Sequence, residues 1–435
     1  MLAAFFGIFI YGLLAALPGS VLPALERNQY LPNDSTVGTF LLINAAGAVL
    51  AYLLSGPVID RAGKKPALAI GAFLVIVSMV AFALVLSVVS PAASLALIFG
   101  CSLVLGFGAN AVVAAGHALV ADVAASWRNA ALNLLDICFG LGLATLPLFV
   151  QTIQGKGGLP AVFWVLGLGT AGLFLLVLTL RFPGAAHQDA AALGEAKTLF
   201  RNPSFWLLAM ALFMYVGAEV SVGKWVVTFM ERDPQIIAQQ GLDATALTAI
   251  SRTSTQALDH FFETDTTGVR VATYALRSLS FFAFALLFGR LVSSLLLSVF
   301  RVNSLILLTA GSGLNAAALI ISFTAGNPSL VRMGLIIAGF GMGPIFPTSV
   351  GLASVMMPRL AGTAMSLVMG VGFAGLLVIP PAVGYISSAM GGPTGNVRAG
   401  LSAVIAASVT MLLLHIALTF REHRLASRSS LNANA

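Results

Sequence analysis

The stretch Gly-Pro-Val-Ile-Asp-Arg-Ala-Gly-Lys-Lys, at residues 56–65, is a short charged segment between two long apolar segments, 36–58 and 67–89. A helix needs about 20 mostly apolar residues to cross the roughly 30 Å hydrocarbon core of a bilayer. Both neighbouring segments are long enough. The stretch therefore predicts a tight turn between two transmembrane helices, with its charges at the membrane surface.

The composition extends this prediction to the whole chain. Of the 435 residues, 59% are hydrophobic and 9% are charged, whereas soluble domains carry roughly 25% charged residues. A soluble enzyme, a secreted disulfide scaffold and a disordered protein are therefore excluded. The net charge of +7 is not concentrated in a basic cluster, so no nucleic-acid partner is expected. Cys101 and Cys138 lie in apolar runs away from metal-ligand patterns, and no cofactor or metal is expected.

Length favours helices over the short alternating strands of a barrel. We predict an all-α polytopic membrane protein whose twelve transmembrane helices span 2–25, 36–58, 67–89, 94–121, 128–151, 160–181, 204–230, 271–290, 302–323, 329–355, 362–388 and 397–420. An even number of crossings places both termini on one side. Twelve basic residues fall in the loops and tail on the side of the termini, against four in the short loops opposite. The positive-inside rule then predicts a cell (plasma or inner) membrane protein with both termini cytoplasmic.

The two halves of the chain resemble each other. Leu-Gly-Phe-Gly at residues 105–108 corresponds to Ala-Gly-Phe-Gly at residues 338–341, and a glycine-rich span follows each. Two copies in the same orientation predict two six-helix bundles related by a pseudo-twofold axis along the membrane normal. The predicted parts are bundle 1–181, cytoplasmic linker 182–203, bundle 204–420 with an outer insertion 231–270, and cytoplasmic tail 421–435. Within the insertion, 247–262 is either a solvated loop or an amphipathic surface helix.

Residues 56–65 resemble the signature G-x-x-x-D-R-x-G-R/K-R/K of the major facilitator superfamily at all six defined positions. The resemblance implies the major facilitator fold and transport by alternating access. Within the superfamily, residues 215–225 of the seventh span are similar to a pattern of the fucose permease-like and sodium-dependent glucose transporter-like proteins. Residues 128–135 and 343–347 are similar to their fifth and tenth spans. This implies that the substrate is a sugar.

The signature also predicts an inner gate. Gly56 lets helices approach closely and Gly63 permits the tight turn. Asp60 and Arg61 would exchange partners as the gate opens and closes, and the two lysines would hold the turn at the anionic leaflet. Asp122 would pair with Arg61 or Arg128. The predicted gating residues are Gly56, Asp60, Arg61, Gly63, Lys64, Lys65, Asp122 and Arg128.

Charged side chains inside the spans are candidates for function, because a charge in hydrocarbon needs a partner or a watery cavity. Glu219 lies mid-way along the seventh span, with Tyr215 four residues before it on the same face and Gly223 four residues after it. We expect Glu219 either to couple a cation or to accept a hydrogen bond from a sugar hydroxyl. The alternative is a structural ion pair with an arginine such as Arg277.

Neutral side chains complete the predicted binding site. Asn110 in the fourth span and Asn133 in the fifth are candidate ligands for hydroxyl groups. Trp225 is either a platform for the apolar face of a sugar or part of an interfacial aromatic belt. Lys224 is expected to extend towards the outer surface. The predicted substrate-binding residues are Tyr215, Glu219, Trp225, Asn110 and Asn133.

Two further ionisable side chains join Glu219 as candidates for cation coupling. Asp136 in the fifth span is either a coupling carboxylate or the ion-pair partner of Arg277 or Arg290. His117 in the fourth span can carry a proton near neutral pH, or can serve as a hydrogen-bonding residue between helices.

These features predict a monomeric secondary active transporter in the lipid bilayer, which moves a small polar solute, a monosaccharide, by symport with H⁺ or Na⁺. Uniport stays open. The alternative is a proton-coupled exporter of drugs or hydrophobic metabolites, which the same signature permits. A membrane-embedded enzyme is not expected, because the sequence contains no nucleophile-and-base motif and no metal-binding motif.

Overall fold

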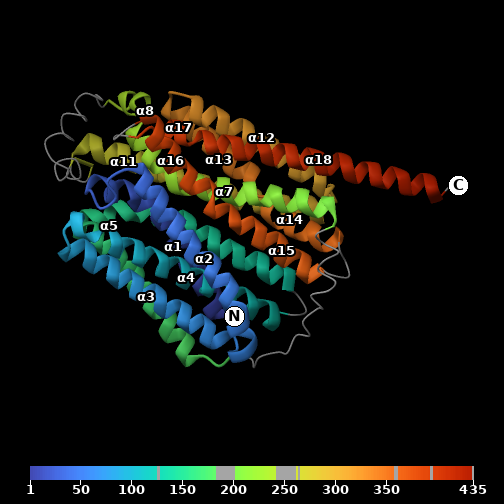
Figure 1. Ribbon diagram of the computed structural model, residues 1–435, viewed down its shortest axis with the longest axis horizontal. Helices are drawn as coiled ribbons and strands as arrows, with labels where there is room; N and C mark the ends of the chain where they lie inside the picture. Colours follow the sequence, from blue (N-terminus) through green and yellow to red (C-terminus); the bar gives the residue numbers. More distant parts are fainter. Residues whose placement is uncertain are drawn as a thin grey trace.

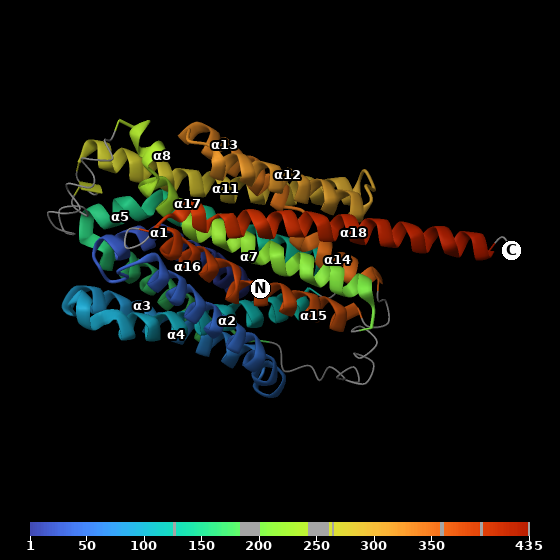
Figure 2. The same cartoon turned by 45° about the horizontal axis from the view of Figure 1, so that its top comes forward.

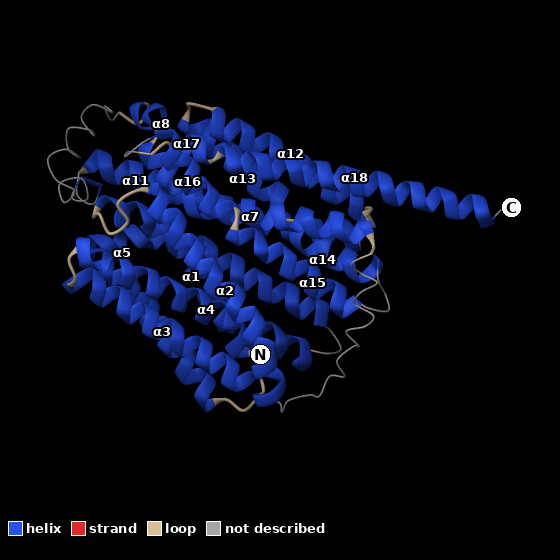
Figure 3. Cartoon of the chain, viewed as in Figure 1, coloured by secondary structure: helices blue, strands red, loops and turns tan. Residues whose placement is uncertain are grey.

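The computed structural model describes residues 1–124, 128–182, 201–241, 261–262, 265–356, 361–391 and 395–433. Within these ranges all regular structure is helical (Figure 3). The first half forms α1 (Leu2–Arg27), α2 (Asp34–Ala62), α3 (Lys64–Val88), α4 (Pro91–Val123) and α5 (Arg128–Thr179). The second half forms α7 (Pro203–Arg232), α8 (Pro234–Ala238), α11 (Thr266–Ser298), α12 (Ser304–Thr324), α13 (Pro328–Met342), α14 (Ile345–Met356), α15 (Ala361–Ala374), the 3-10 turn η3 (Gly375–Leu377), α16 (Ile379–Gly391), α17 (Val397–Gly400) and α18 (Ser402–Ala433).

The described helices confirm the predicted twelve crossings. Eleven helical segments are long and apolar enough to span a membrane. One of them, α5, contains two helices, because the backbone leaves the helical conformation at Gly157 (φ −146°, ψ 16°) and Gly158 (φ 68°, ψ −176°). The tenth crossing is divided into α13 and α14 beside Pro344, and the eleventh into α15, η3 and α16 before Pro380, since proline removes a helical hydrogen bond.

The helices begin at side chains that cap them. Asn33 accepts a hydrogen bond from the backbone N–H of Thr36 at 2.9 Å, and the Thr36 hydroxyl accepts one from the N–H of Asn33, which completes a capping box before α2. Asp265 and Asn303 cap α11 and α12 in the same manner with one side chain each. Capping satisfies N–H groups that have no partner within the helix, and it places the helix starts at the ends of the bundle.

The internal repeat has a physical basis in glycine contacts between helices. A Cβ added at Gly106 would lie 2.0 Å from the Asn44 carbonyl oxygen of α2, and one at Gly108 would lie 2.9 Å from the Gly71 oxygen of α3. The corresponding two glycines of α13 make equivalent backbone contacts. Gly339 lies against the Phe282 carbonyl of α11, and Gly341 against the Gly311 carbonyl of α12. In each half, two glycines two residues apart seat one helix against two neighbours, as close backbone packing in membranes requires.

The two bundles meet along three helix pairs, α1 with α7, α2 with α16, and α5 with α11. In Figure 1, α3 and α4 of the first half run diagonally whereas α12 and α18 of the second half run nearly horizontally, and α5 and α11 lie close together at the left of the view. We call this left end, which holds residues 28–33 and 233–241, the distal end. Both termini lie towards the other end, which we call the terminal end.

The last helix runs further than its predicted end at residue 420. In Figure 2, α18 extends past the other helices at the terminal end. It is anchored where it leaves the bundle, because Ser204 of α7 donates to Glu422 Oε1 at 2.5 Å and Arg421 Nε donates to the same hydroxyl at 2.9 Å. The tail predicted at 421–435 is therefore helical up to Ala433.

The turn of residues 56–65 lies between α2 and α3. Gly63 has φ 88° and ψ 174°, a conformation that favours glycine, so its predicted role in the turn is confirmed. Lys65 Nζ donates to the carbonyls of Leu178 and Leu180, both at 2.8 Å, and so caps the C-terminal end of α5. Lys64 is buried.

Several predictions lie outside the described residues. These are the surroundings of Gly56, the side chains of Asp60, Arg61, Asp122 and Arg128, nearly all of linker 182–203, and the amphipathic segment 247–262 except Phe261 and Phe262.

Gly63→Ala should lower the free energy of unfolding by about 1–2 kcal/mol, because a Cβ at positive φ strains the backbone. Nothing described lies within 4 Å of an added Cβ at this position, so the strain is purely conformational. Thermal unfolding of the purified protein measures the effect. Gly172→Ala, at an exposed helical position of α5 with similar free space, should leave the stability unchanged or slightly raised. Equal stability of the two variants would contradict the assigned strain.

Candidate functional site

A buried ion pair lies between α7 and α11. Glu219 Oε1 is 3.8 Å from Arg290 Nη2, and each side chain is 13% exposed. The sequence left open an ion pair of Glu219 with an arginine such as Arg277. The partner in the structure is Arg290, the last residue of the predicted span 271–290. Tyr215, one helical turn before Glu219, lies within electrostatic range of both charges. The face of α7 that carries Tyr215 and Glu219 therefore lies against the guanidinium of Arg290.

Some polar atoms of this cluster have capacity for a ligand. The Tyr215 hydroxyl and the Arg290 Nε are buried and have no partner in good hydrogen-bond geometry within the described ranges, although the Tyr215 side chain lies close to both Glu219 and Arg290. A Cβ added at Gly223 would meet no described heavy atom within 4 Å. Buried polar atoms are normally hydrogen-bonded, so these two atoms have capacity for a further hydrogen bond.

Aromatic rings extend the cluster towards α2. Phe346 of α14 lies 6.4 Å from Tyr215, between ring centroids, and 6.1 Å from Phe373 of α15. Phe373 stacks on Tyr52 of α2, with centroids 5.0 Å apart and planes at 25°. The Tyr52 hydroxyl is buried without a hydrogen-bond partner among the described residues. These rings connect the two bundles across the centre of the protein.

The first bundle contributes polar groups of its own. Asn110 of α4 is 6% exposed; its Nδ2 donates to the Gly106 carbonyl at 2.8 Å, and its Oδ1 accepts from the Tyr11 hydroxyl at 3.3 Å. Tyr11 stacks on Phe139 of α5 at 5.5 Å, and the Arg290 guanidinium lies 5.9 Å from the centroid of the Phe139 ring. Asn110 and Glu219 therefore belong to one continuous set of contacts that spans both bundles.

The other predicted coupling residues lie beside this set. His117 Nε2 is 3.9 Å from Asp136 Oδ1, and His117 Nδ1 lies 2.9 Å from the Val113 carbonyl oxygen. Asp136 is within electrostatic range of Arg290 and Glu219. The structure thus brings together all three predicted coupling residues around Arg290. Both side chains of the His117–Asp136 pair are partly exposed, 40% and 31%.

Two predicted placements are different in the structure. Trp225 is completely buried, and its Nε1 donates to the Pro380 carbonyl at 3.0 Å, so it joins α7 to α16 rather than lying in a belt or on a ligand. Lys224 is 8% exposed and does not extend to the surface. The side chain of Asn133 lies outside the described residues.

The sequence named Arg290 only as a possible partner of Asp136 and did not predict its pairing with Glu219; it did not indicate Tyr11 or the three phenylalanines at all. Arg290 stood at the boundary of a predicted span, where an arginine is read as an interfacial charge. The helix continues to Ser298, which places Arg290 eight residues inside it. A longer apolar run, Leu291–Val299 with only serine as polar interruption, was the signal that could have identified it.

At the distal end, three ion pairs join the bundles. Arg27 Nη1 contacts Glu231 Oε2 at 2.7 Å. Arg232 contacts both Glu26 and Asp34 at 2.7 Å.

Further polar contacts and one close backbone contact extend this junction. Ser387 of α16 donates to Asp34, and Arg398 binds Asp233 at 2.7 Å within the second half. A Cβ at Gly19 of α1 would lie 1.8 Å from the Gly223 carbonyl oxygen of α7. The structure is therefore a conformation closed at the distal end.

Comparison with known proteins identifies the family. Residues 4–250, more than half of the chain, match the Major Facilitator Superfamily. The chain belongs to this superfamily. Its relatives include the membrane protein MosC of Rhizobium meliloti, 25% identical with 89% of this chain and 84% of that protein covered. Another is the Saccharomyces cerevisiae bypass of stop codon protein 6, 21% identical with 88% and 76% covered.

Solved structures of several transporters share the fold. The D-xylose-proton symporter superposes with a TM-score of 0.71 at 15% identity, covering 96% of both chains. The nucleoside transporter NupG gives 0.70 at 14% identity, covering 96% of this chain and 97% of that one. The Escherichia coli fucose:proton symporter gives 0.61 at 16%, covering 96% and 98%. These values confirm the predicted architecture of two six-helix bundles, and the superfamily is one of multi-pass membrane transporters.

Arg232→Gln should open the distal end. The substitution leaves Glu26 and Asp34 buried together without their cation, and breaking a buried pair costs about 3–5 kcal/mol. That cost applies only to the closed conformation, so the closed population should fall by about tenfold or more. The rate at which a membrane-impermeant maleimide labels Thr228→Cys, a buried position one turn before the ion pairs, measures opening.

Cys101 and Cys138 are replaced by alanine in this experiment. Arg270→Gln is the matched control, because it removes the same charge at the same end, where the guanidinium donates to the Gln240 carbonyl. Labelling as slow in Arg232→Gln as in the control would show that the ion pairs do not hold the distal end closed.

Proposed function

We propose that the protein is a secondary active transporter that moves a monosaccharide by alternating access, coupled to the symport of H⁺ or Na⁺. The observation that carries the proposal is the Glu219–Arg290 pair. It lies buried between polar and aromatic side chains of both bundles, next to unpaired polar atoms and free space at Gly223.

The chemistry of the cluster suits a sugar. Sugar hydroxyls both donate and accept hydrogen bonds, and the cluster offers a carboxylate, a guanidinium, an amide and phenol hydroxyls. The apolar face of a pyranose packs on aromatic rings, which Phe139, Phe346 and Phe373 provide. The three solved structures that share the fold are those of a D-xylose symporter, a fucose symporter and a nucleoside transporter. At 14–16% identity these names support the proposal by analogy of fold only.

Arg290 gives a route from cation binding to movement. It belongs to the second bundle, where it pairs with Glu219, and it also lies over Phe139 of the first bundle. A proton or Na⁺ on Glu219 neutralises the carboxylate, which releases the guanidinium to pair more closely with Asp136 of α5. The same arginine then binds the second bundle in one state and the first bundle in the other. A ligand that changes this balance shifts the conformational equilibrium.

The termini are proposed to face the cytoplasm, in accord with the positive charge of the loops at that end. The transport unit is proposed to be the monomer, because one chain contains both bundles that alternating access requires. Catalysis of a chemical reaction forms no part of the proposal.

Glu219→Gln should abolish gradient-driven sugar accumulation while leaving exchange of labelled for unlabelled sugar. Glutamine has the size of glutamate and can still form hydrogen bonds, but it carries no negative charge and so cannot bind the coupling cation. Proteoliposomes assayed with labelled hexoses, with and without H⁺ or Na⁺ gradients, measure both activities. Full accumulation by the variant would overturn the role of Glu219. Transport of a lipophilic cation with no exchange of any sugar would favour the exporter instead.

Gly223→Leu should block sugar binding, because the new side chain enters the space at Gly223, one helical turn after Glu219, where no described heavy atom lies within 4 Å of an added Cβ. We expect at least about a tenfold loss of exchange, with the protein still folded, since no described atom stands in the way of the added Cβ. Gly100→Leu, at an exposed helical position of α4 with equally free surroundings, is the control and should exchange normally. Normal exchange by Gly223→Leu would place the substrate elsewhere.

A further inference from the structure

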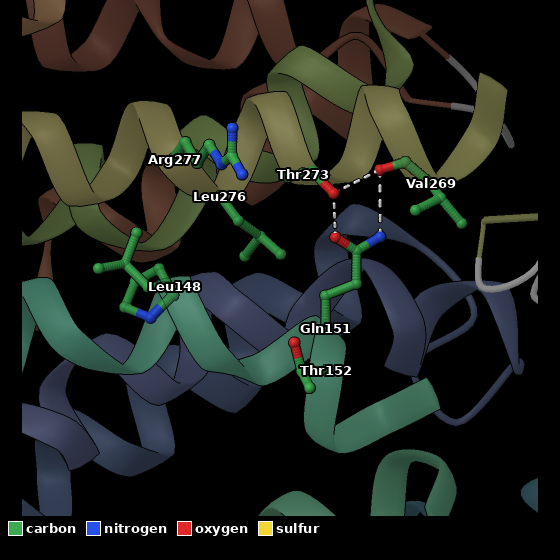
Figure 4. Close-up of a pocket in the computed structure, with 8 residues that line it drawn as sticks. Leu148, Gln151, Thr152, Val269, Thr273, Leu276 and Arg277 are labelled. Atoms are coloured by element: carbon green, nitrogen blue, oxygen red, sulfur yellow. Dashed lines mark hydrogen bonds between the residues drawn. The ribbon is translucent and has the colours of Figure 1, made fainter. Parts of the chain in front are cut away.

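A pocket of about 370 Å³ lies on the lateral seam between α5 and α11, away from the central cluster. Figure 4 shows Leu148, Gln151 and Thr152 on the α5 side, and Thr273, Leu276 and Arg277 on the α11 side. The two helices belong to different bundles, so anything bound here touches both halves of the protein.

One wall of the pocket is a fixed polar junction. Gln151 Nε2 donates to the Val269 carbonyl at 3.2 Å, and the Thr273 hydroxyl donates to Gln151 Oε1 (Figure 4). The opposite part of the wall is apolar, with Pro147, Leu148 and Leu276. The pocket is therefore amphipathic, with polar groups on one side and hydrocarbon on the other.

Arg277 faces the lipid rather than the protein interior. It is exposed, and the residues that follow it on the same face of α11 are the exposed Phe281, Phe284 and Phe288, at 40%, 41% and 59%. The spacing of four, seven and eleven residues places all four side chains on one stripe. Arg277 lies eleven residues into α11, about 16 Å from its first residue. In the described parts of the chain it has no ion-pair or hydrogen-bond partner.

A second cation lies close by. Arg332 of α13 is within electrostatic range of Arg277. Its Nε donates to the Ser278 hydroxyl at 2.9 Å, its Nη2 donates to the Tyr274 carbonyl at 2.9 Å, and its guanidinium lies 3.3 Å from the centroid of the Tyr274 ring. These contacts hold a fixed positive charge beside Arg277. Two like charges in a membrane-embedded surface attract an anion.

We propose that this pocket binds the phosphate headgroup of an anionic phospholipid from the distal half of the bilayer. The Arg277 guanidinium would bind the phosphate oxygens, as arginine does in bidentate contacts. Thr152 and Gln151 offer partners to the glycerol oxygens, and the acyl chains would lie along the phenylalanine stripe of α11. On the cytoplasmic side of membranes, basic pockets between transmembrane helices bind anionic headgroups, and this pocket offers the same combination of charge and apolar walls in the distal half. The bound lipid would bridge the two bundles in the conformation closed at the distal end.

The test is lipid binding to the purified protein, measured by native mass spectrometry with phosphatidylglycerol or phosphatidylcholine added to the detergent micelle. The wild type should retain phosphatidylglycerol. Arg277→Gln should bind it about tenfold more weakly, because the variant loses one charge-assisted hydrogen bond to the phosphate. Arg277→Lys should retain an intermediate affinity. Arg301→Gln removes the same charge from an exposed position beyond the other end of α11, and it should bind as the wild type does.

A second variant and a soluble probe keep the result decisive. Leu148→Trp fills the pocket from α5 without changing charge and should also displace phosphatidylglycerol. sn-Glycerol 3-phosphate, which carries the headgroup chemistry without acyl chains, should neither bind nor compete. Equal retention of phosphatidylcholine, unchanged binding in both Arg277→Gln and Leu148→Trp, or competition by glycerol phosphate would each overturn the proposal.

Discussion

Every polar group that enters the hydrocarbon region must find its partner inside the protein, and this constraint determines the structure at every level. It forces the backbone into helices whose starts are capped by Asn and Asp side chains. It explains why Trp225 donates its N–H to the Pro380 carbonyl, at a place where two successive prolines disturb α16. Two polar atoms of the central cluster do not meet this constraint. The Tyr215 hydroxyl and Arg290 Nε, without partners in good hydrogen-bond geometry in the described ranges, are costly unless a ligand or water completes them.

Most of the fold could be predicted from the sequence, because apolar segments of sufficient length have one physical solution in a bilayer. The repeat was visible for a related reason. Gly106, Gly108, Gly339 and Gly341 occupy contacts that only glycine fits, so the spacing of the glycines records the packing of the helices. The break of α5 at Gly157 and Gly158 falls between the predicted spans 128–151 and 160–181. The continuation of α18 beyond residue 420 was not predicted, because it runs past the apolar segment on which the prediction rested.

The site was predicted in part. Glu219, Tyr215, Asn110, Asp136 and His117 were found because a polar residue inside an apolar span is conspicuous. Their mutual contacts were not found, since helix periodicity says which residues share a face but not which face meets which neighbour. Trp225 illustrates the limit. Its position near the end of a span is the same for a belt residue, a ligand platform and a buried link between helices, and only the packing of α7 on α16 distinguishes them.

The helical extension of α18 has a practical consequence. With 32 residues at about 1.5 Å each, the helix is longer than the hydrocarbon core is thick, and it is clasped to α7 through Ser204 where it leaves the bundle. A protein fused in helical register to its end would keep a defined orientation relative to the membrane domain. In electron cryomicroscopy a small transporter is largely hidden in its micelle and offers few features for particle alignment. A rigid fused protein could supply those features.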